Sequence, residues 1–279
     1  MFPVLFQIGG FTVTSFGVMM ALAFLAAGWI ASREMGRMGE DPEQAWDLVG
    51  YAAVFGILGS KIYYLILNWH ETAAHPMRAI LSRAGLVWYG GLILAAAVIA
   101  WRVKKTGLPL GKMADASALA LAVGYAVGRM GCFLVGDDYG RPTDLPWAVA
   151  FPQGAPPSTA ENLRGFGVDI PASVPANTVF AVHPTQLYEV GMSLIIYFIL
   201  KRVQPRFATP GMLFFVWVAL AGVERFIVEI FRAKDDRFLG MFSVAQLISV
   251  VLAAAGVAGM AYLARRSAAP RVAGRTAAA

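Results

Sequence analysis

Residues 114–144 read ADASALALAVGYAVGRMGCFLVGDDYGRPTD, and this stretch decides the fold class. Its first part, up to Val135, is an apolar run of about 20 residues, which is long enough to cross a bilayer core as a helix. Its second part holds glycines, aspartates and a proline, which are typical of turns and loops. The stretch therefore predicts a transmembrane helix that ends near residue 135 and a polar segment directly after it.

The composition of the whole chain indicates a polytopic membrane protein. Of its 279 residues, 58% are hydrophobic and 14% are charged, and the mean hydropathy is +0.62. A soluble protein would have about a quarter charged residues. The net charge of +6 does not indicate a nucleic-acid partner, because the basic residues form short clusters between apolar runs. A single cysteine excludes an internal disulfide and a multi-cysteine metal site, and MFPVLFQIGG lacks the basic start of a cleavable signal peptide.

Similar apolar runs recur along the chain, and we predict an all-α integral membrane protein with seven transmembrane helices. The expected spans are 11–32, 46–67, 86–103, 114–135, 185–203, 210–231 and 242–264. The connection at about 136–184, between spans four and five, is rich in proline and glycine, which predicts an irregular extracytoplasmic loop rather than an eighth helix. Residues 1–264 are expected to form one membrane domain, and the small, basic tail 265–279 to be disordered.

The distribution of basic residues predicts the orientation of these spans. With the N-terminus outside and the C-terminus inside, the clusters at 102–112, 201–206 and 265–275 all lie on the inner side. Short inner loops of membrane proteins carry an excess of lysine and arginine. We therefore expect an N-out, C-in topology.

Three basic residues lie within apolar spans, and this topology places them at one depth. Lys61 and Arg225 each precede the outer end of a span by six residues, which is roughly 9 Å along a helix, and Arg129 lies at a similar level. Charged residues within a bilayer are costly, and they usually face the bundle interior and serve a function. Tyr89 and His183 begin inward-running spans at the same level. The sequence therefore predicts a site in the outer leaflet.

The chemistry of this site is indicated by ERFIVEIFR (224–232), where Arg225, Glu229 and Arg232 share one helix face. Glu229 would hold an arginine in place, and guanidinium groups suit phosphate, the abundant anion at this depth. The alternative is a buried Arg–Glu–Arg network that only locks helices together. Lys61 could likewise extend to the head groups, and His183 could be either a loop residue or a base.

Five segments, in this order, resemble the bacterial prolipoprotein diacylglyceryl transferases. They are GSKIYYLI (59–66), VWYGGLI (87–93), GRMGCFLVGDDYGRPTDLPWAVAFP (128–152), HPTQLYE (183–189) and GVERFIVEIFR (222–232). That family transfers a diacylglyceryl group from phosphatidylglycerol to the lipobox cysteine thiol of a prolipoprotein, forms a thioether and releases glycerol phosphate. The resemblance implies the same activity at the outer leaflet of the bacterial inner membrane, with phosphatidylglycerol and the prolipoprotein signal peptide as partners. We expect a monomer that needs no cofactor or metal.

The resemblance also implies roles for individual residues. Arg129 and Arg225 would clamp the phosphate of the donor lipid, and Tyr89 and His183 are the candidate bases. The expected substrate-binding residues are Lys61, Gly131, Asp137, Gly140, Gln186, Tyr188, Glu189, Glu229 and Arg232.

The chain departs from the family's usual residues at five positions. Tyr89 stands where the family usually has histidine, Cys132 and Val135 replace two asparagines, Phe16 replaces a tyrosine, and Lys61 replaces an arginine. Tyrosine, with a pKa near 10, is a poorer base than histidine. The departures allow an alternative function, a catalytically altered or silent paralogue that binds phospholipid without ordinary turnover. Cys132 is either a nucleophile or a small buried residue.

Overall fold

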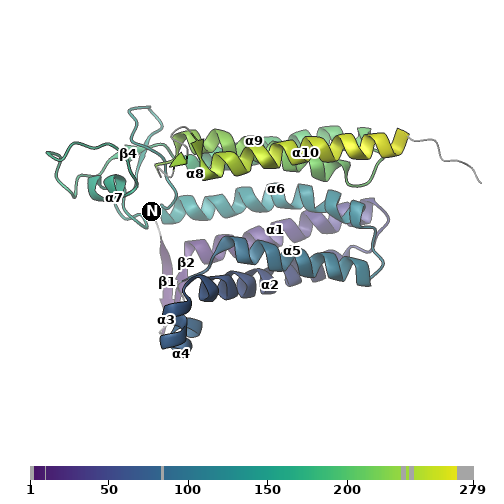
Figure 1. Ribbon diagram of the computed structural model, residues 1–279, viewed down its shortest axis with the longest axis horizontal. Coiled ribbons are helices and arrows are strands. Elements are labelled where there is room, and N and C mark those ends of the chain that lie inside the picture. The colour runs from purple at the N-terminus through teal and green to yellow at the C-terminus, as the bar shows by residue number, and fades with distance from the viewer. Residues whose placement is uncertain (1–2, 10, 83–84, 234–236, 239–241, 269–279) are drawn as a thin grey trace, which may run out of the picture.

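A bundle of seven long helices dominates the computed structural model, which describes residues 3–9, 11–82, 85–233, 237–238 and 242–268. The long helices lie side by side along one direction (Figure 1). They are α1 (Ser15–Arg37), α2 (Glu43–Leu67), α5 (Trp88–Lys105), α6 (Leu110–Val135), α8 (Thr185–Val203), α9 (Met212–Phe231) and α10 (Val244–Ala268). Each coincides with one predicted span to within a few residues, so the predicted helices are confirmed as helices.

Most of the short elements gather at one end of the bundle, on the left in Figure 1, which we call the loop end. It carries the hairpin β1–β2, the short helices α3 and α4, and the whole segment 136–184. The short elements are β1 (Val4–Ile8), β2 (Phe11–Thr14), α3 (Trp69–Ala74), α4 (Pro76–Leu81), β3 (Val149–Ala150), α7 (Ala160–Gly165), β4 (Ala181–Val182), β5 (Arg237–Phe238) and β6 (Phe242–Ser243). The strands pair antiparallel as β1–β2, β3–β4 and β5–β6. The 3₁₀ turn Gln204–Arg206 follows α8.

The first helix begins later than predicted, because residues 11–14 form a strand. Val13 and Thr12 pair with Phe6 and Gln7 of β1. Thr14 then acts as the N-cap of α1, and its Oγ1 accepts a hydrogen bond of 3.1 Å from the amide of Gly17. Side-chain caps of this kind satisfy amides that have no partner in the first helical turn. The prediction that span one starts at residue 11 was therefore wrong by four residues.

Helix α6 is the centre of the bundle. It packs against α1, α8 and α9, while α2 packs mainly on α5 and α9 on α10. Ala118, Ala122 and Ala126 of α6 are buried, and such small residues let neighbouring helices approach closely. Leu119 joins Leu200 of α8 and other apolar residues of α1 and α9 in one core cluster. Because α6 packs against several helices, residues at its loop end can meet residues from several elements.

The segment 136–184 contains only short elements, as predicted, yet it has a core of its own. Phe151, Leu163 and Val182 are fully buried and pack with Tyr139. The phenol of Tyr139 donates a hydrogen bond of 2.7 Å to the carbonyl of Pro157, and burial raises the pKa of Tyr139 to about 12. The segment is therefore a packed cap on the loop end.

In the described part of the chain, four helices are long and apolar enough to cross a membrane by length and composition: α1, α2, α6 and the part of α10 at Val244–Ser267. Helices α5, α8 and α9 are shorter, with 18, 19 and 20 residues, and each has three charged residues within that length. The protein is thus a mostly helical membrane protein. Helix α10 continues to Ala268, so the start of the predicted tail 265–279 is helical, and residues 269–279 lie outside the described residues.

Candidate active site at the loop end of the bundle

Arg129, near the loop end of α6, is held by two carboxylates from different segments. Its Nη1 lies 3.1 Å from Asp138 Oδ2, and its Nη2 forms an ion pair with Glu189 Oε2 of α8. The side chains of Arg129 and Glu189 are only 11% and 2% exposed. Tyr125, one helical turn before Arg129, donates a hydrogen bond of 2.7 Å to Glu189 Oε1. The predicted functional arginine is therefore buried, paired and oriented.

Asp138 joins Arg129 to a second arginine. Its Oδ1 lies 2.6 Å from Nη2 of Arg232, which directly follows α9. The backbone of Asp138 has a φ of 56°, a left-handed conformation that aspartate tolerates better than most residues. Burial acts to raise the pKa of this carboxyl, but Arg232 and Arg129 outweigh burial and hold the pKa below its usual value. Asp138 is therefore an ionised bridge between two guanidinium groups.

Arg225 and Glu229 extend the same network along α9. Nη2 of Arg225 lies 2.5 Å from Glu229 Oε2, and Nε of Arg232 lies 3.8 Å from the same oxygen. The i, i+4 pairing expected from the sequence is thus present. Three arginines and three carboxylates now form one alternating chain, which we call the arginine network: Glu189, Arg129, Asp138, Arg232, Glu229 and Arg225.

Gly140 fixes the cap against the end of α9. Its amide donates a hydrogen bond of 2.8 Å to the carbonyl of His183, and it forms a β-bridge with Arg232. A Cβ atom on Gly140 would meet the carbonyl oxygen of Phe231, and it would lie 2.7 Å from His183 Cβ. Only glycine fits such a close approach of two backbones. The position predicted to shape the loop therefore holds Arg232 in register.

The start of α8 holds the two aspartates. Gln186 is fully buried, and its Nε2 donates to the carbonyl of Asp137. The hydroxyl of Thr185 donates to the carbonyl of Asp138 at 2.7 Å. Burial, and then the neighbouring Asp138, raise the pKa of the Asp137 carboxyl. Helix α8 thus positions the backbone of the aspartates, while Arg129 and Arg232 hold the Asp138 side chain.

His183 lies in an aromatic cluster beside the arginine network. Its Nδ1 is 3.1 Å from the hydroxyl of Tyr188, which also accepts a hydrogen bond of 2.7 Å from Trp147. Its ring centroid lies 5.2 Å from that of Phe231. Burial lowers the pKa of His183, so the ring is neutral at pH 7. In the tautomer whose Nδ1–H donates to Tyr188, Nε2 is left to accept a proton.

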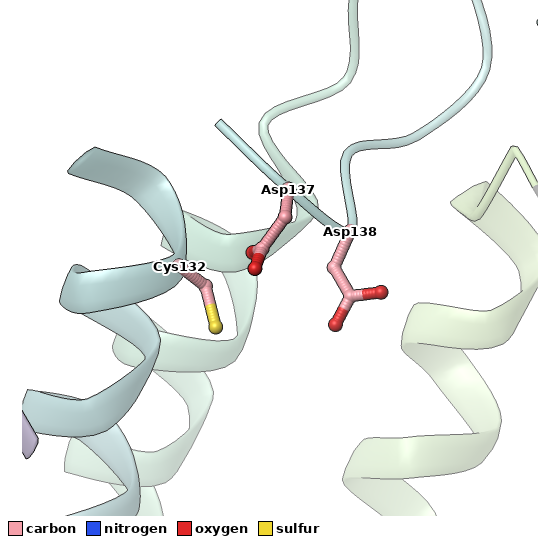
Figure 2. Close-up of side chains that lie close together, drawn as sticks. All are labelled: Cys132, Asp137 and Asp138. Carbon is pink, nitrogen blue, oxygen red and sulfur yellow. The ribbon is translucent and has the colours of Figure 1, made fainter. Parts of the chain in front are cut away.

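Cys132, Asp137 and Asp138 form the one group of potential metal ligands found among the described residues, and their ligand atoms lie within 4.8 Å of one another. Figure 2 shows the carboxylate of Asp137 directed toward the thiol of Cys132, with the carboxylate of Asp138 beside them. Nη1 of Arg129 lies 3.4 Å from the Cys132 sulfur. Since Asp138 already pairs with two guanidinium groups, a metal cation would face positive charge there. The group fits an anion-binding network better than a metal site.

Three predicted site residues have other partners. Lys61 Nζ donates to the carbonyl of Ser82 at 2.8 Å and lies 5.3 Å from the centre of the Tyr64 ring. Tyr89 is 52% exposed and packs edge-on against Trp88. Gly131 faces α1, where a Cβ atom would lie 2.9 Å from Met19 Cβ. Within the described ranges, no ion pair or hydrogen bond joins Lys61 or Tyr89 to the arginine network.

Three members of the site were not predicted from the sequence. Tyr125 orients Glu189, Asp138 rather than Asp137 pairs with the arginines, and Glu224 is buried beside Arg225. Glu224 had a usable signal, because it is an ionisable residue inside an apolar span, the criterion that identified Arg129. Asp138 had no such signal in the sequence, since two neighbouring aspartates in a loop differ only in the direction that the backbone gives their side chains.

Comparison with known proteins identifies the family. The family model described as prolipoprotein diacylglyceryl transferase matches residues 3–262. The chain belongs to this family. A phosphatidylglycerol–prolipoprotein diacylglyceryl transferase of Geobacter sulfurreducens is 32% identical over 278 residues, which cover 96% of this chain and 97% of that protein. Proteins of the same name from Vibrio vulnificus and from a Nostoc species are 32% and 30% identical, over 95% and 94% of this chain.

The match to the diacylglyceryl transferase family spans nearly the whole chain, so it includes both the bundle and the cap. All five segments that carried the resemblance lie within the matched residues. Three of them, at 128–152, 183–189 and 222–232, supply the arginine network from α6, α8, α9 and the cap. The family is therefore recognised through residues that meet at one place in the fold.

Proposed function

We propose that this protein transfers a diacylglyceryl group from phosphatidylglycerol to the lipobox cysteine thiol of prolipoproteins, at the outer leaflet of the bacterial inner membrane. The observation that carries the proposal is the arginine network, which lies at the loop end between α6, α8 and α9. Guanidinium groups in a site with little water bind phosphate strongly, and the donor lipid loses its phosphate, as glycerol phosphate, in this transfer.

The reaction can be written with this chain's own residues. The acceptor thiol gives up its proton, its sulfur forms a bond to the terminal carbon of the diacylglyceryl group, and the bond from that carbon to the phosphate oxygen breaks. The electron pair leaves with glycerol phosphate, whose growing negative charge Arg129 and Arg225 stabilise. Their positive field also favours the thiolate form of the acceptor.

A base must take the thiol proton, and we assign this role to His183. Its neutral ring is held by Tyr188, and its carbonyl is fixed to Gly140 beside the network. Tyr89 remains a predicted second candidate, and Lys61 a predicted contact for lipid or acceptor. Turnover measured in the variants His183→Phe, Tyr89→Phe and Lys61→Met distinguishes the three residues. Loss of turnover in His183→Phe alone supports the assignment, and loss of turnover in Tyr89→Phe alone contradicts it.

We also propose that all seven long helices cross the membrane, with the N-terminus and the loop end outside. The ends of α5, α8 and α10 opposite the cap carry basic residues, and inner ends usually do. In a Cys132→Ala background, a single cysteine at exposed Glu161 of α7 should react with a membrane-impermeant maleimide in intact cells. A cysteine at Arg206 should react only after lysis, and the reverse labelling would overturn this topology.

Complementation tests the transfer itself. The gene is supplied to bacteria depleted of their own diacylglyceryl transferase, with an Arg129→Ala variant as the matched control. We expect mature, lipid-modified lipoproteins and growth with the unaltered gene only. Normal membrane expression without lipid modification would reject the proposal. If the purified protein then binds phosphatidylglycerol without releasing glycerol phosphate, the alternative of a silent phospholipid-binding paralogue is correct.

A further inference from the structure

Glu224 is a buried acidic residue that is not part of the arginine network. It lies on α9, directly before Arg225, and is only 6% exposed. Its Oε1 is fully buried and has no hydrogen-bond partner among the described residues. Buried polar atoms in folded proteins are nearly always paired, so an unpaired one that faces a site indicates a contact with the ligand of that site.

The neighbourhood of Glu224 is the donor-lipid site. It lies within electrostatic range of Glu189, Arg129 and Arg225. Two arginine nitrogens there, Nε of Arg129 and Nη1 of Arg225, are also buried without a hydrogen-bond partner in the described part of the chain. The site therefore offers both donors and an acceptor. A bare phosphate would use the donors only, whereas a phosphate with a hydroxyl-bearing head group would use both.

Charge balance indicates the protonation state of Glu224. The three arginines of the network already pair with three carboxylates. A fourth buried carboxylate would have no countercharge, which is very costly, and it would repel the anionic lipid. A neutral carboxylic acid avoids both costs, and it donates one hydrogen bond and accepts others.

We infer that Glu224 is a neutral acid that binds the glycerol hydroxyls of the donor lipid's head group, and so distinguishes phosphatidylglycerol from other anionic phospholipids. The inference rests on the proposed function, because it places the head group at the arginine network. Arg225, whose side chain is 31% exposed, is the network arginine most open to an entering head group. Glu224 and the arginines thus divide the head group between them, with hydroxyls on one side and phosphate on the other.

The test compares two lipids that differ only in these hydroxyls. Full-length purified protein in detergent micelles is titrated with phosphatidylglycerol and with phosphatidylpropanol of the same acyl chains, and bound lipid is measured by native mass spectrometry. We expect the unaltered protein to prefer phosphatidylglycerol by roughly tenfold, which corresponds to about one net hydrogen bond. Glu224→Met should abolish this preference by weakening phosphatidylglycerol alone, and Glu224→Gln, a neutral donor and acceptor, should largely keep it.

Two controls separate this role from a structural one. Glu229→Gln, which loosens Arg225, should weaken both lipids alike, and the exposed Glu161→Gln should change neither. Equal binding of the two lipids by the unaltered protein overturns the inference even if Glu224→Met does not fold. Equal weakening of the binding of both lipids by Glu224→Met also overturns it. If the protein prefers phosphatidylglycerol but shows no turnover, the transfer reaction is rejected and the head-group contact is still supported.

Discussion

Removing Arg129 should damage both stability and turnover, and a second substitution should separate the two effects. In Arg129→Ala, Asp138 keeps its ion pair with Arg232. Glu189, only 2% exposed, keeps just the hydrogen bond from Tyr125. Breaking a buried ion pair by removing one partner costs about 3–5 kcal/mol, since the other charge stays buried and unpaired. Because Tyr125 still donates to Glu189, we expect a loss near the lower end, about 3 kcal/mol.

The double variant Arg129→Ala/Glu189→Gln removes the orphaned charge while keeping an acceptor for Tyr125. Its free energy of unfolding should return to within about 1 kcal/mol of the original, because a buried pair contributes little once both charges are gone. Turnover should stay low by a factor of about 10²–10³, the usual effect of losing one group that stabilises developing negative charge. Stability and activity therefore separate only if Arg129 acts on the phosphate.

Two measurements on the same preparations decide this prediction. Unfolding in mixed micelles by a denaturing detergent gives stability, and release of glycerol phosphate from phosphatidylglycerol in the presence of a lipobox peptide gives turnover. Arg102→Ala is the matched control, since its pair with Asp47 is 3.7 Å long and partly exposed, and such pairs contribute about 0–1 kcal/mol. If the double variant regains both stability and turnover, the network only locks the helices together, and Arg129 does not act on the phosphate.

Three further predictions concern the cap. Gly140→Ala should destabilise the protein by about 1–3 kcal/mol and reduce turnover, because its Cβ would collide with the carbonyl of Phe231; a normal melting temperature would contradict this. Asp138, whose pKa is lowered by Arg232 and Arg129, should contribute stability that is complete above about pH 3.9 and lost as the pH falls through the lowered value. Asp138→Asn, which tolerates the same backbone, should remove that acid-dependent part of the unfolding curve. With His183 as base, kcat/KM should rise with pH through a pKa below about 6.5, because burial lowers its pKa; an unchanged profile in His183→Gln would exclude this role.

The helices were predictable from the sequence because apolar length and turn residues are local signals. The end of α6 at Val135 was predicted correctly, since Gly136 adopts a left-handed conformation, with a φ of 74°, and stops the helix. The hairpin before α1 was not predicted, because FTVT has no turn residue or charge that separates it from the apolar run that follows it. Here pairing with β1, a tertiary feature, decides the structure.

The site was predictable only in part, for a similar reason. Arg129 and Arg225 were predictable as site residues because a charge inside an apolar span is costly and usually serves a function. Spacing also paired Arg225 with Glu229, since partners four residues apart meet on any helix. The partners of Arg129 come from α8 and from the cap. Their choice depends on how the helices pack and on the left-handed backbone at Asp138, neither of which the local sequence specifies.

The exposure of the network's members indicates from which side a phosphate reaches it. Glu189 and Glu229 are 2% and 4% exposed, so they anchor the arginines from within the bundle. Asp138 is 41% exposed and Arg225 31%, so these two face outward. An entering phosphate therefore meets the exposed Arg225 and the carboxylate of Asp138. It competes with that carboxylate for Arg129 and Arg232. The network is balanced in charge without the lipid, and it favours binding only where phosphate replaces Asp138 as a partner.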